Sequence, residues 1–261
     1  MKGVDPVFDV ENRVAVITGA CGLIGRELVG ALHARGARVV VVDIEASGPE
    51  AYAASVGADV TGVACDVADA ASVAHLRDLV LDRHGRVDIL INAHAARPRG
   101  FATAVAEDFP EELWDVLMDV NLKGTFLMCR DFGAAMLERG KGSIVNFSST
   151  YGVVSSNPDL YTGNSLGNPV AYSVSKSGVI MLTRYLGAYW SGRGVRVNCV
   201  TPHGVSNRHE PAFIERFCAK SPMRRLMEPH EIVGPVLYLA SDASSYATGS
   251  NLMVDGGWTA W

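Results

Sequence analysis

The segment Tyr172-Ser173-Val174-Ser175-Lys176 carries a phenol and an ammonium group four positions apart. On a helix this spacing places both side chains on one face, close to each other. The spacing alone is weak evidence, because such pairs also arise by chance. Its position gives the pair weight, since the expected helix follows a strand that ends in Ser148-Ser149, two hydroxyl side chains. These residues are the first candidates for an active site.

A glycine-rich turn is the second candidate site. Residues 14–17 have the pattern of a buried strand, and the sequence TGACGLIG at 18–25 follows them and opens a helix. Glycines permit a tight turn and let backbone N–H groups at a helix N-terminus approach a pyrophosphate. The context predicts a dinucleotide-binding turn made by Gly19, Cys21, Gly22, Leu23, Ile24 and Gly25.

Two acidic residues come at the ends of later strands. Asp43 ends the second expected strand, 18 positions after Gly25. A carboxylate there can accept hydrogen bonds from both hydroxyls of an adenosine ribose and would repel a 2′-phosphate, so NAD is favoured over NADP. Asp66 and Val67 follow the third strand, where they would lie beside the adenine; an ordinary loop position is the alternative for Asp66.

The elements that must position these residues alternate along the chain. Short β-branched runs predict strands at 14–17, 39–42, 60–65, 88–92, 143–147, 195–200 and 251–254, and helical patterns cover 24–34, 71–83, 113–137 and 171–190. Fully apolar strands separated by helices indicate a mostly parallel sheet covered on both faces. With no repeat, linker or composition break, residues 1–261 are expected to form one doubly wound α/β Rossmann domain of about seven strands.

Composition excludes several classes of protein. The net charge is -5 and no run of lysines or arginines occurs, which argues against a nucleic-acid partner. The longest apolar runs have strand length, so no membrane span is expected. The N-terminal residues lack the apolar core of a signal peptide. The five cysteines form no CxxC pair, which excludes a zinc ribbon and suits a reducing compartment, so a cytoplasmic protein without a metal is expected.

Several sequence blocks, in this order, resemble the short-chain dehydrogenase/reductase family, in its single-domain branch, from about Phe8 to Trp261. They are TGACGLIG (18–25), Asp43, CDV (65–67), DILINA (88–93), VNLKGTF (120–126), IVNFSS (144–149), YSVSK (172–176), RVNCVTP (196–202) and DGGW (255–258). The resemblance implies an NAD-dependent enzyme with the catalytic tetrad Asn121, Ser149, Tyr172 and Lys176. It adds cofactor contacts from Asn92, Ala93, Tyr172, Lys176, Pro202, Gly204 and Val205.

The chemistry of these residue types supports the roles that the resemblance implies. A tyrosine with a pKa of ~10 is a poor base, and lowering that pKa to ~7 requires about 4 kcal/mol of phenolate stabilisation. An ammonium at ~4 Å supplies on the order of 4 kcal/mol at an effective dielectric of 20, and oxidised nicotinamide adds positive charge. Tyr172 can then exchange a proton with the substrate oxygen, which Ser149 polarises. Lys176 can also hold the nicotinamide ribose, and Asn121 is expected to anchor a water that relays protons.

The chain departs from the family pattern in three short motifs. The glycine loop has the spacing of the epimerase-rich branch. The usual NNAG becomes Asn92-Ala93-His94-Ala95. His94 is a candidate substrate contact, but a structural role is the favoured alternative. The usual proline-glycine becomes Pro202-His203-Gly204, which places an imidazole near the nicotinamide. His203 therefore contacts substrate, or is a tolerated loop residue.

A longer difference separates Ser149 from Tyr172, because residues 151–169 form an insertion rich in Asn, Ser and Gly. Both ends are fixed at catalytic positions, so the insertion is expected to wall the substrate pocket, with Tyr161 as a contact; an exposed loop is the alternative. A similar insertion and the ending GGWTAW resemble members associated with sugar and nonulosonate biosynthesis.

In the family, the segment that corresponds to residues 203–225 forms a lid. An anionic substrate is an open alternative, because basic residues that could bind a carboxylate or phosphate are expected at the rims of the pocket. They are Arg97, Arg99, Arg208, His209, Arg224 and Arg225.

The helices at 113–137 and 171–190 carry apolar residues on more than one face, which indicates burial between subunits. Together with the resemblance, this predicts a homotetramer.

The expected function is NAD-dependent interconversion of a secondary alcohol and a ketone on a polyol or sugar-like molecule. Two alternatives remain open. One is a sugar epimerase or dehydratase that retains its NAD, and the other is a non-catalytic NAD-binding sensor.

Overall fold

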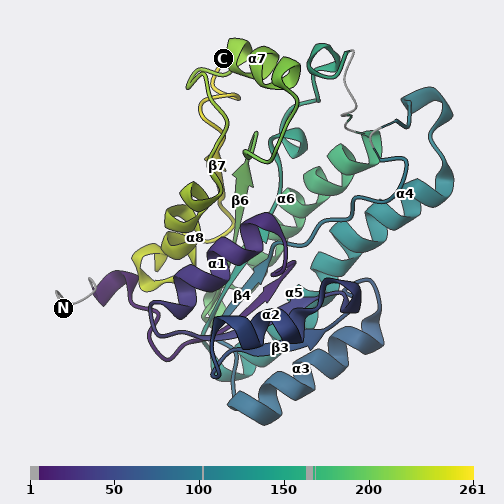
Figure 1. Cartoon of the computed structure of the whole chain (residues 1–261). Helices are drawn as coiled ribbons and strands as arrows, with labels where there is room; N and C mark the ends of the chain where they lie inside the picture. The colour runs from purple at the N-terminus through teal and green to yellow at the C-terminus, as the bar shows by residue number, and fades with distance from the viewer. Residues whose placement is uncertain (1–5, 102, 163–166, 168) are drawn as a thin grey trace.

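The computed structural model describes residues 6–101, 103–162, 167 and 169–261. Within them, seven parallel strands form one sheet in the order β3-β2-β1-β4-β5-β6-β7 (Figure 1). The strands are β1 (Val14–Thr18), β2 (Arg38–Asp43), β3 (Thr61–Ala64), β4 (Ile89–Asn92), β5 (Gly142–Phe147), β6 (Val195–Pro202) and β7 (Asn251–Val254). The expected doubly wound parallel sheet is confirmed.

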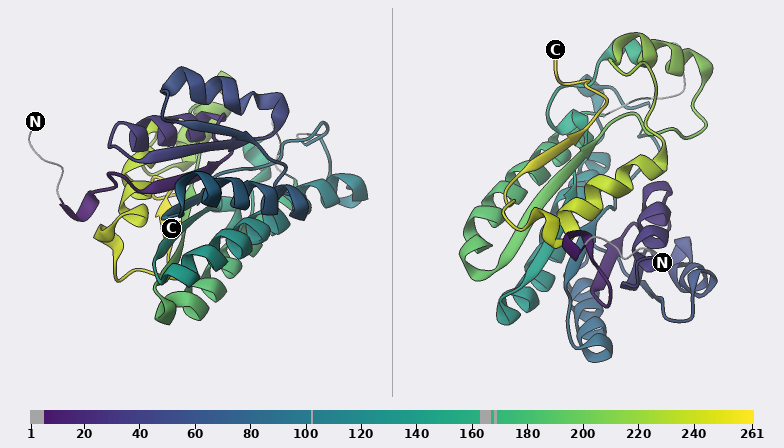
Figure 2. Two further views of the ribbon diagram at one scale, coloured as in Figure 1. Left: turned by 90° about the horizontal axis from the view of Figure 1, so that it is seen from below. Right: turned by 90° about the vertical axis from the view of Figure 1, so that its left-hand side faces the viewer.

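Helices cover both faces of this sheet (Figure 2). They are α1 (Leu23–His33), α2 (Pro49–Val56), α3 (Ala70–His84), α4 (Glu111–Met118), α5 (Thr125–Arg139), α6 (Val170–Trp190), α7 (Pro211–Lys220) and α8 (Val233–Ala240). Two separate cores fill the spaces between the layers: one packs α1, α2 and α8 against the sheet, and the other packs α3, α5 and α6.

Alternation along each strand divides the apolar side chains between the two cores. In β1, Ala15 and Ile17 face the core of α1 and α8, whereas Val14 and Val16 face the core of α3 and α5. All five β1 residues are buried. Because both faces are covered, the strands read as continuous apolar runs rather than alternating ones.

The helix expected at 113–137 is instead two helices joined by a π-helical turn, Asp119–Gly124. A π turn inserts a residue into the helical ladder and so rotates the side chains that follow it. Gly124 lies in this turn against Val67, and a Cβ atom there would come 2.8 Å from the Val67 side chain. The sequence pattern also missed α2, α7 and α8, which have only eight to ten residues.

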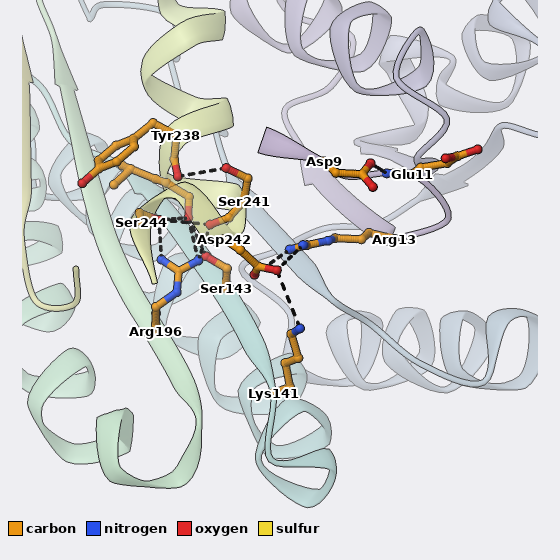
Figure 3. Close-up of polar contacts among 11 residues, drawn as sticks. Asp9, Glu11, Arg13, Lys141, Ser143, Arg196, Tyr238, Ser241, Asp242 and Ser244 are labelled. Atoms are coloured by element: carbon orange, nitrogen blue, oxygen red, sulfur yellow. Dashed lines mark hydrogen bonds and ion pairs between the residues drawn. The ribbon is translucent and has the colours of Figure 1, made fainter. Parts of the chain in front are cut away.

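Polar contacts fasten the end of the sheet that lies away from the glycine turn (Figure 3). Arg196 on β6 donates hydrogen bonds to the carbonyls of Leu239 and Ser241 at the end of α8, at 3.1 and 3.0 Å. Asp242, directly after α8, pairs with Arg13 beside β1 at 2.7 Å. These contacts join the end of α8 to β1 and β6. They lie at the opposite end of the sheet from the carboxyl ends of the strands, where a ligand site is expected.

The strand order reverses between β1 and β4, because the chain runs from β1 outward to β3 and then returns to β4 on the other side. In open α/β sheets, ligands bind in the crevice outside the carboxyl ends of the strands at such a reversal. No helix in the described part of the chain is long and apolar enough to cross a membrane.

Candidate active site

A cavity of about 1260 Å³ opens at the carboxyl ends of the strands. It extends from the glycine turn after β1 to α7. Every site residue expected from the sequence lines it except Asn92 and Asn121. The cavity therefore brings together the expected cofactor and catalytic residues, although they come from all parts of the chain.

Gly19 and Gly25 in the turn after β1 have no room for a side chain. Gly19 has a positive φ of 65°, and a Cβ atom on it would lie 2.8 Å from the Ala93 carbonyl oxygen. Gly22 is the N-cap residue of α1, and no side chain in the described part of the chain caps that end of the helix. The first backbone N–H groups of α1 are thus free for a ligand, and a pyrophosphate suits them because the helix N-terminus favours negative charge.

Asp43 is held at the cavity edge by two backbone groups. Its Oδ2 accepts a hydrogen bond from the Cys21 N–H at 3.0 Å, and its Oδ1 accepts one from the Ile44 N–H at 2.9 Å. Each carboxylate oxygen retains a lone pair for a further donor. None of the described residues that line this end of the cavity is basic, and the Arg26 guanidinium of α1 donates to the Cys21 carbonyl at 2.8 Å. An anionic ligand group placed against Asp43 would meet the negative charge of that carboxylate.

The two asparagines that do not line the cavity support it from behind. Asn92 is buried, and its Nδ2 donates hydrogen bonds to Asn146 Oδ1 on β5 at 2.9 Å and to Cys129 Sγ on α5 at 3.5 Å. Asn121 lies in the π-helical turn. Its Oδ1 accepts from the Ala96 N–H at 2.8 Å and its Nδ2 donates to Ser175 Oγ at 3.1 Å. Both polar ends of the Asn121 side chain are therefore used to join the turn to the loop after β4 and to α6.

Lys176 lines the cavity but is almost fully buried, with 3% of its surface exposed. Its Nζ donates a hydrogen bond to the Phe147 carbonyl at 2.9 Å. Burial, with a smaller effect of the Arg97 guanidinium, lowers the pKa of Lys176 to about 8. The lysine therefore keeps its charge at neutral pH and loses it readily above that value.

Tyr172 lies one turn before Lys176 on α6, with its ring edge-on to Phe101 at 5.7 Å. Burial raises the pKa of Tyr172, whereas a hydrogen bond with Ser149 and the positive charge of Arg97 lower it. Ser149 also accepts a hydrogen bond from the Tyr151 N–H at 3.2 Å, which orients its hydroxyl. The three expected catalytic side chains thus meet on one wall of the cavity.

The expected separation of ~4 Å between the Lys176 ammonium and the phenolate oxygen, at which the Coulomb effect is large, stays a prediction. Nζ lies 5.9 Å from the centre of the Tyr172 ring and donates its hydrogen bond to the Phe147 carbonyl. Burial leaves the pKa of Tyr172 raised, although the hydrogen bond with Ser149 and the positive charge of Arg97 oppose the rise.

The six basic residues considered at the rims do not form one anion site. Only Arg97 and His209 line the cavity. Arg225 pairs instead with Glu231 at 2.6 Å. Aromatic side chains gather at the end of the cavity near α7. They include Phe213, Phe217 and Trp258. The sequence patterns did not identify most of them as site residues, because they come from α7 and the C-terminal segment.

His94, a candidate substrate contact, is enclosed by threonines. Its Nδ1 lies 2.6 Å from Thr18 Oγ1 and its Nε2 lies 3.3 Å from Thr125 Oγ1. Burial, assisted by the charge of Lys176, lowers the pKa of His94 to about 3. Each ring nitrogen lies within hydrogen-bond distance of a threonine hydroxyl, so we expect His94 to act as a structural link between β1 and α5.

Acid should therefore destabilise the protein through His94. Because its pKa in the folded chain lies below the unfolded value, its stabilising contribution is complete above about pH 6.5 and is lost as the pH falls toward 3. We expect the free energy of unfolding to fall by on the order of 3 kcal/mol between pH 6.5 and 4 on this account. Urea titrations of the wild type and His94→Asn at both pH values test this. The free energy of unfolding of His94→Asn should decrease less than that of the wild type between the two pH values. His75→Asn, a substitution of an exposed histidine, should show the same decrease as the wild type. Equal decreases in all three proteins would contradict the prediction.

The fold and the cavity define a dinucleotide-binding α/β protein, and comparison with known proteins identifies its family. A family model described as enoyl-(acyl carrier protein) reductase matches residues 19–259. The D-threitol dehydrogenase of Mycolicibacterium smegmatis is 41% identical over 98% of this chain and 96% of that protein. The galactitol 2-dehydrogenase (L-tagatose-forming) of Cereibacter sphaeroides is 37% identical over 98% of both chains.

A solved structure agrees with these relatives. The short-chain dehydrogenase of Leptospira borgpetersenii with bound NAD+ superposes with a TM-score of 0.88, at 31% identity, covering 99% of this chain and 97% of that one. The chain belongs to the short-chain dehydrogenase/reductase family. It is an oxidoreductase that acts on CH–OH groups and uses a nicotinamide dinucleotide.

Proposed function

We propose that the protein is an NAD-dependent dehydrogenase that interconverts a secondary alcohol of a polyol and the corresponding ketone. The observation that carries this proposal is the meeting of Ser149, Tyr172 and Lys176 on one wall of the cavity whose far end holds the glycine turn and Asp43. The polyol relatives support the substrate class, since they cover nearly the whole chain.

The cavity residues fit a nicotinamide dinucleotide, with the free N–H groups of α1 at the pyrophosphate and Asp43 at the adenosine ribose. When bound, the dinucleotide would supply the hydride acceptor for oxidation of the carbinol carbon and the hydride donor for reduction of the ketone. Val67 and Ala93 line the adenosine end, and Pro202, Gly204 and Val205 line the nicotinamide end. NAD is proposed over NADP because Asp43 would repel a 2′-phosphate.

Tyr172 is the proposed acid and base at the substrate oxygen. In the oxidation it takes the alcohol proton on its phenolate oxygen, and in the reduction it returns the proton. Ser149 donates its hydroxyl proton to the same oxygen and stabilises negative charge there. Lys176, charged at neutral pH, holds the ribose and adds positive charge near the phenol. Asn121 keeps the π turn and Ser175 in place, and so fixes the base of α6 on which Tyr172 and Lys176 stand.

A panel of substrates tests the proposal. Purified protein is incubated with NAD or NADP and with D-threitol, galactitol, aldonates and polyol phosphates, and the reduced dinucleotide is followed by its absorbance. We expect reduction of NAD with a neutral polyol and a much slower reaction with NADP. Turnover restricted to aldonates or phosphates would point instead to an anionic substrate held by Arg97. Copurifying dinucleotide without net reduction would favour a retained-cofactor epimerase or dehydratase, which the glycine spacing suggests.

We also propose a homotetramer in the cytoplasm. Large apolar side chains stay exposed on α6, with Met181, Tyr185 and Tyr189 each more than 60% exposed, and Phe126 on α5 is 42% exposed. Exposed apolar patches of this kind mark association surfaces. All five cysteines are free, which suits a reducing compartment. The mass in solution, measured by light scattering, distinguishes a monomer from a dimer and a tetramer.

A further inference from the structure

The imidazole of His203 projects from the loop after β6 into the wall of the cavity. Its backbone N–H donates to the Val254 carbonyl at 3.3 Å, which ties the loop to β7. The side chain is buried, with 8% of the residue exposed, and its Nε2 has no hydrogen-bond partner in the described part of the chain. A buried polar atom without a partner costs free energy, so a ligand group that pairs with it gains binding.

Three aromatic rings fix the orientation of this imidazole. The ring centres of Trp258, Phe217 and Tyr151 lie 4.4, 5.0 and 5.2 Å from the centre of the His203 ring. This burial lowers the pKa of His203 to about 4. At neutral pH the ring is therefore uncharged, with one donor nitrogen and one acceptor nitrogen.

Two tyrosine hydroxyls lie on the same wall. The Oη atoms of Tyr151 and Tyr161 are 2.7 Å apart, so one of their two protons is shared between them. The second proton remains available to a ligand, as do lone pairs on both oxygens. Burial raises the pKa of both phenols, that of Tyr161 to about 12, and both stay neutral. Tyr161 belongs to the 151–169 insertion, of which residues 163–166 and 168 lie outside the described residues.

We propose that His203, Tyr151 and Tyr161 form a hydroxyl-binding wall that holds a substrate hydroxyl carried on a carbon other than the reacting one. This inference rests on the proposed function and makes these residues determinants of its specificity. The wall is neutral and has both donors and acceptors, which matches an alcohol group rather than an ion. A substrate without that hydroxyl leaves the buried groups of the wall unpaired, and sites of this kind reject such analogues strongly.

The test compares four-carbon alcohols that differ in their hydroxyl groups: D-threitol, 2,3-butanediol and 2-butanol. We expect kcat/KM of the wild type to fall by at least about tenfold for each step that removes hydroxyls from the wall. His203→Phe keeps an aromatic ring among its neighbours but removes both nitrogens. In this variant KM for D-threitol should rise about tenfold, with kcat much less affected. The preference for D-threitol over 2-butanol should shrink by the same factor, whereas the Kd for NADH should stay unchanged.

Two further variants separate recognition from packing. Tyr161→Phe removes one hydroxyl of the pair and should also raise KM for D-threitol and reduce the preference. Leu226→Val loosens the apolar cluster that Leu226 forms with Phe213 and Phe217, but it removes no polar group and none of the three rings around His203, so it should leave the preference ratio intact.

Two results would overturn the inference. One is a loss in His203→Phe that is equal for all three alcohols, and the other is a loss of preference in Leu226→Val that matches the one in His203→Phe. If the wild type reduces NAD with none of the polyols in the panel, the proposed function itself is wrong. Polyol turnover with an unchanged preference in His203→Phe contradicts the hydroxyl-binding wall alone.

Discussion

Tyr172→Phe should reduce polyol turnover by about a thousandfold or more, because it removes the group that exchanges a proton with the substrate oxygen, and positioned acid–base groups contribute on this scale. The ring itself remains, with its edge contact to Phe101. The phenylalanine also needs no hydrogen-bond partner in this half-buried position. Binding of NADH should therefore change less than about threefold, since a substitution away from the binding contacts has a small effect.

The Tyr172→Phe experiment needs two measurements, steady-state turnover of the best polyol and titration of NADH fluorescence. Tyr185→Phe is the matched control, because Tyr185 is on the same helix but is 65% exposed. It should retain wild-type turnover. Undiminished turnover in Tyr172→Phe would show that another group moves the proton, and loss of NADH binding would show that Tyr172 is structural.

Asp43→Ser should reverse much of the cofactor preference. The carboxylate accepts from two backbone N–H groups and offers its remaining lone pairs to a ribose. A hydrogen bond to a charged group contributes about 1.5–3 kcal/mol, so NADH binding should weaken by about tenfold or more. NADPH should bind more tightly once the like charge is gone, and the ratio of the two Kd values should change by about a hundredfold.

Asp43→Asn separates charge from hydrogen bonding. The amide oxygen can still accept from the Cys21 N–H, but the negative charge is absent. If repulsion sets the preference, this variant should tolerate NADPH nearly as well as Asp43→Ser does. Tight NADPH binding by the wild type, or an unchanged ratio of Kd values in both variants, would refute the proposed role of Asp43.

The parts of the site that the sequence predicted depend on local structure. The glycine turn comes directly after β1, and Asp43 is the last residue of β2. Tyr172 and Lys176 lie on one helix, α6. Their positions are therefore set by the element that carries them, and the structure places all of them on the cavity. The seven expected strands were found for the same reason, because a buried parallel strand is a short apolar run with clear ends.

The features that the sequence did not predict depend on contacts between distant segments. The π-helical turn interrupts an apolar pattern that continues across it, so 113–137 has the pattern of one helix. Asn92 turns away from the cavity because alternation along β4 directs it toward Asn146. The ring contacts around His203 join three segments far apart in the chain, and no local pattern in the sequence signals their meeting.

Transfer of a hydride from a secondary carbinol to a dissociable NAD is tested most directly with a polyol deuterated on its secondary carbons, such as D-threitol labelled at both. The proposed function predicts that NADH carrying one deuterium accumulates in solution in equal amount to the ketone. It also predicts that Tyr172→Phe forms this product about a thousandfold more slowly or slower still. Unlabelled dinucleotide, or recovery of the label in a stereoisomeric alcohol without free NADH, would contradict the dehydrogenase function and favour a reaction on a retained cofactor.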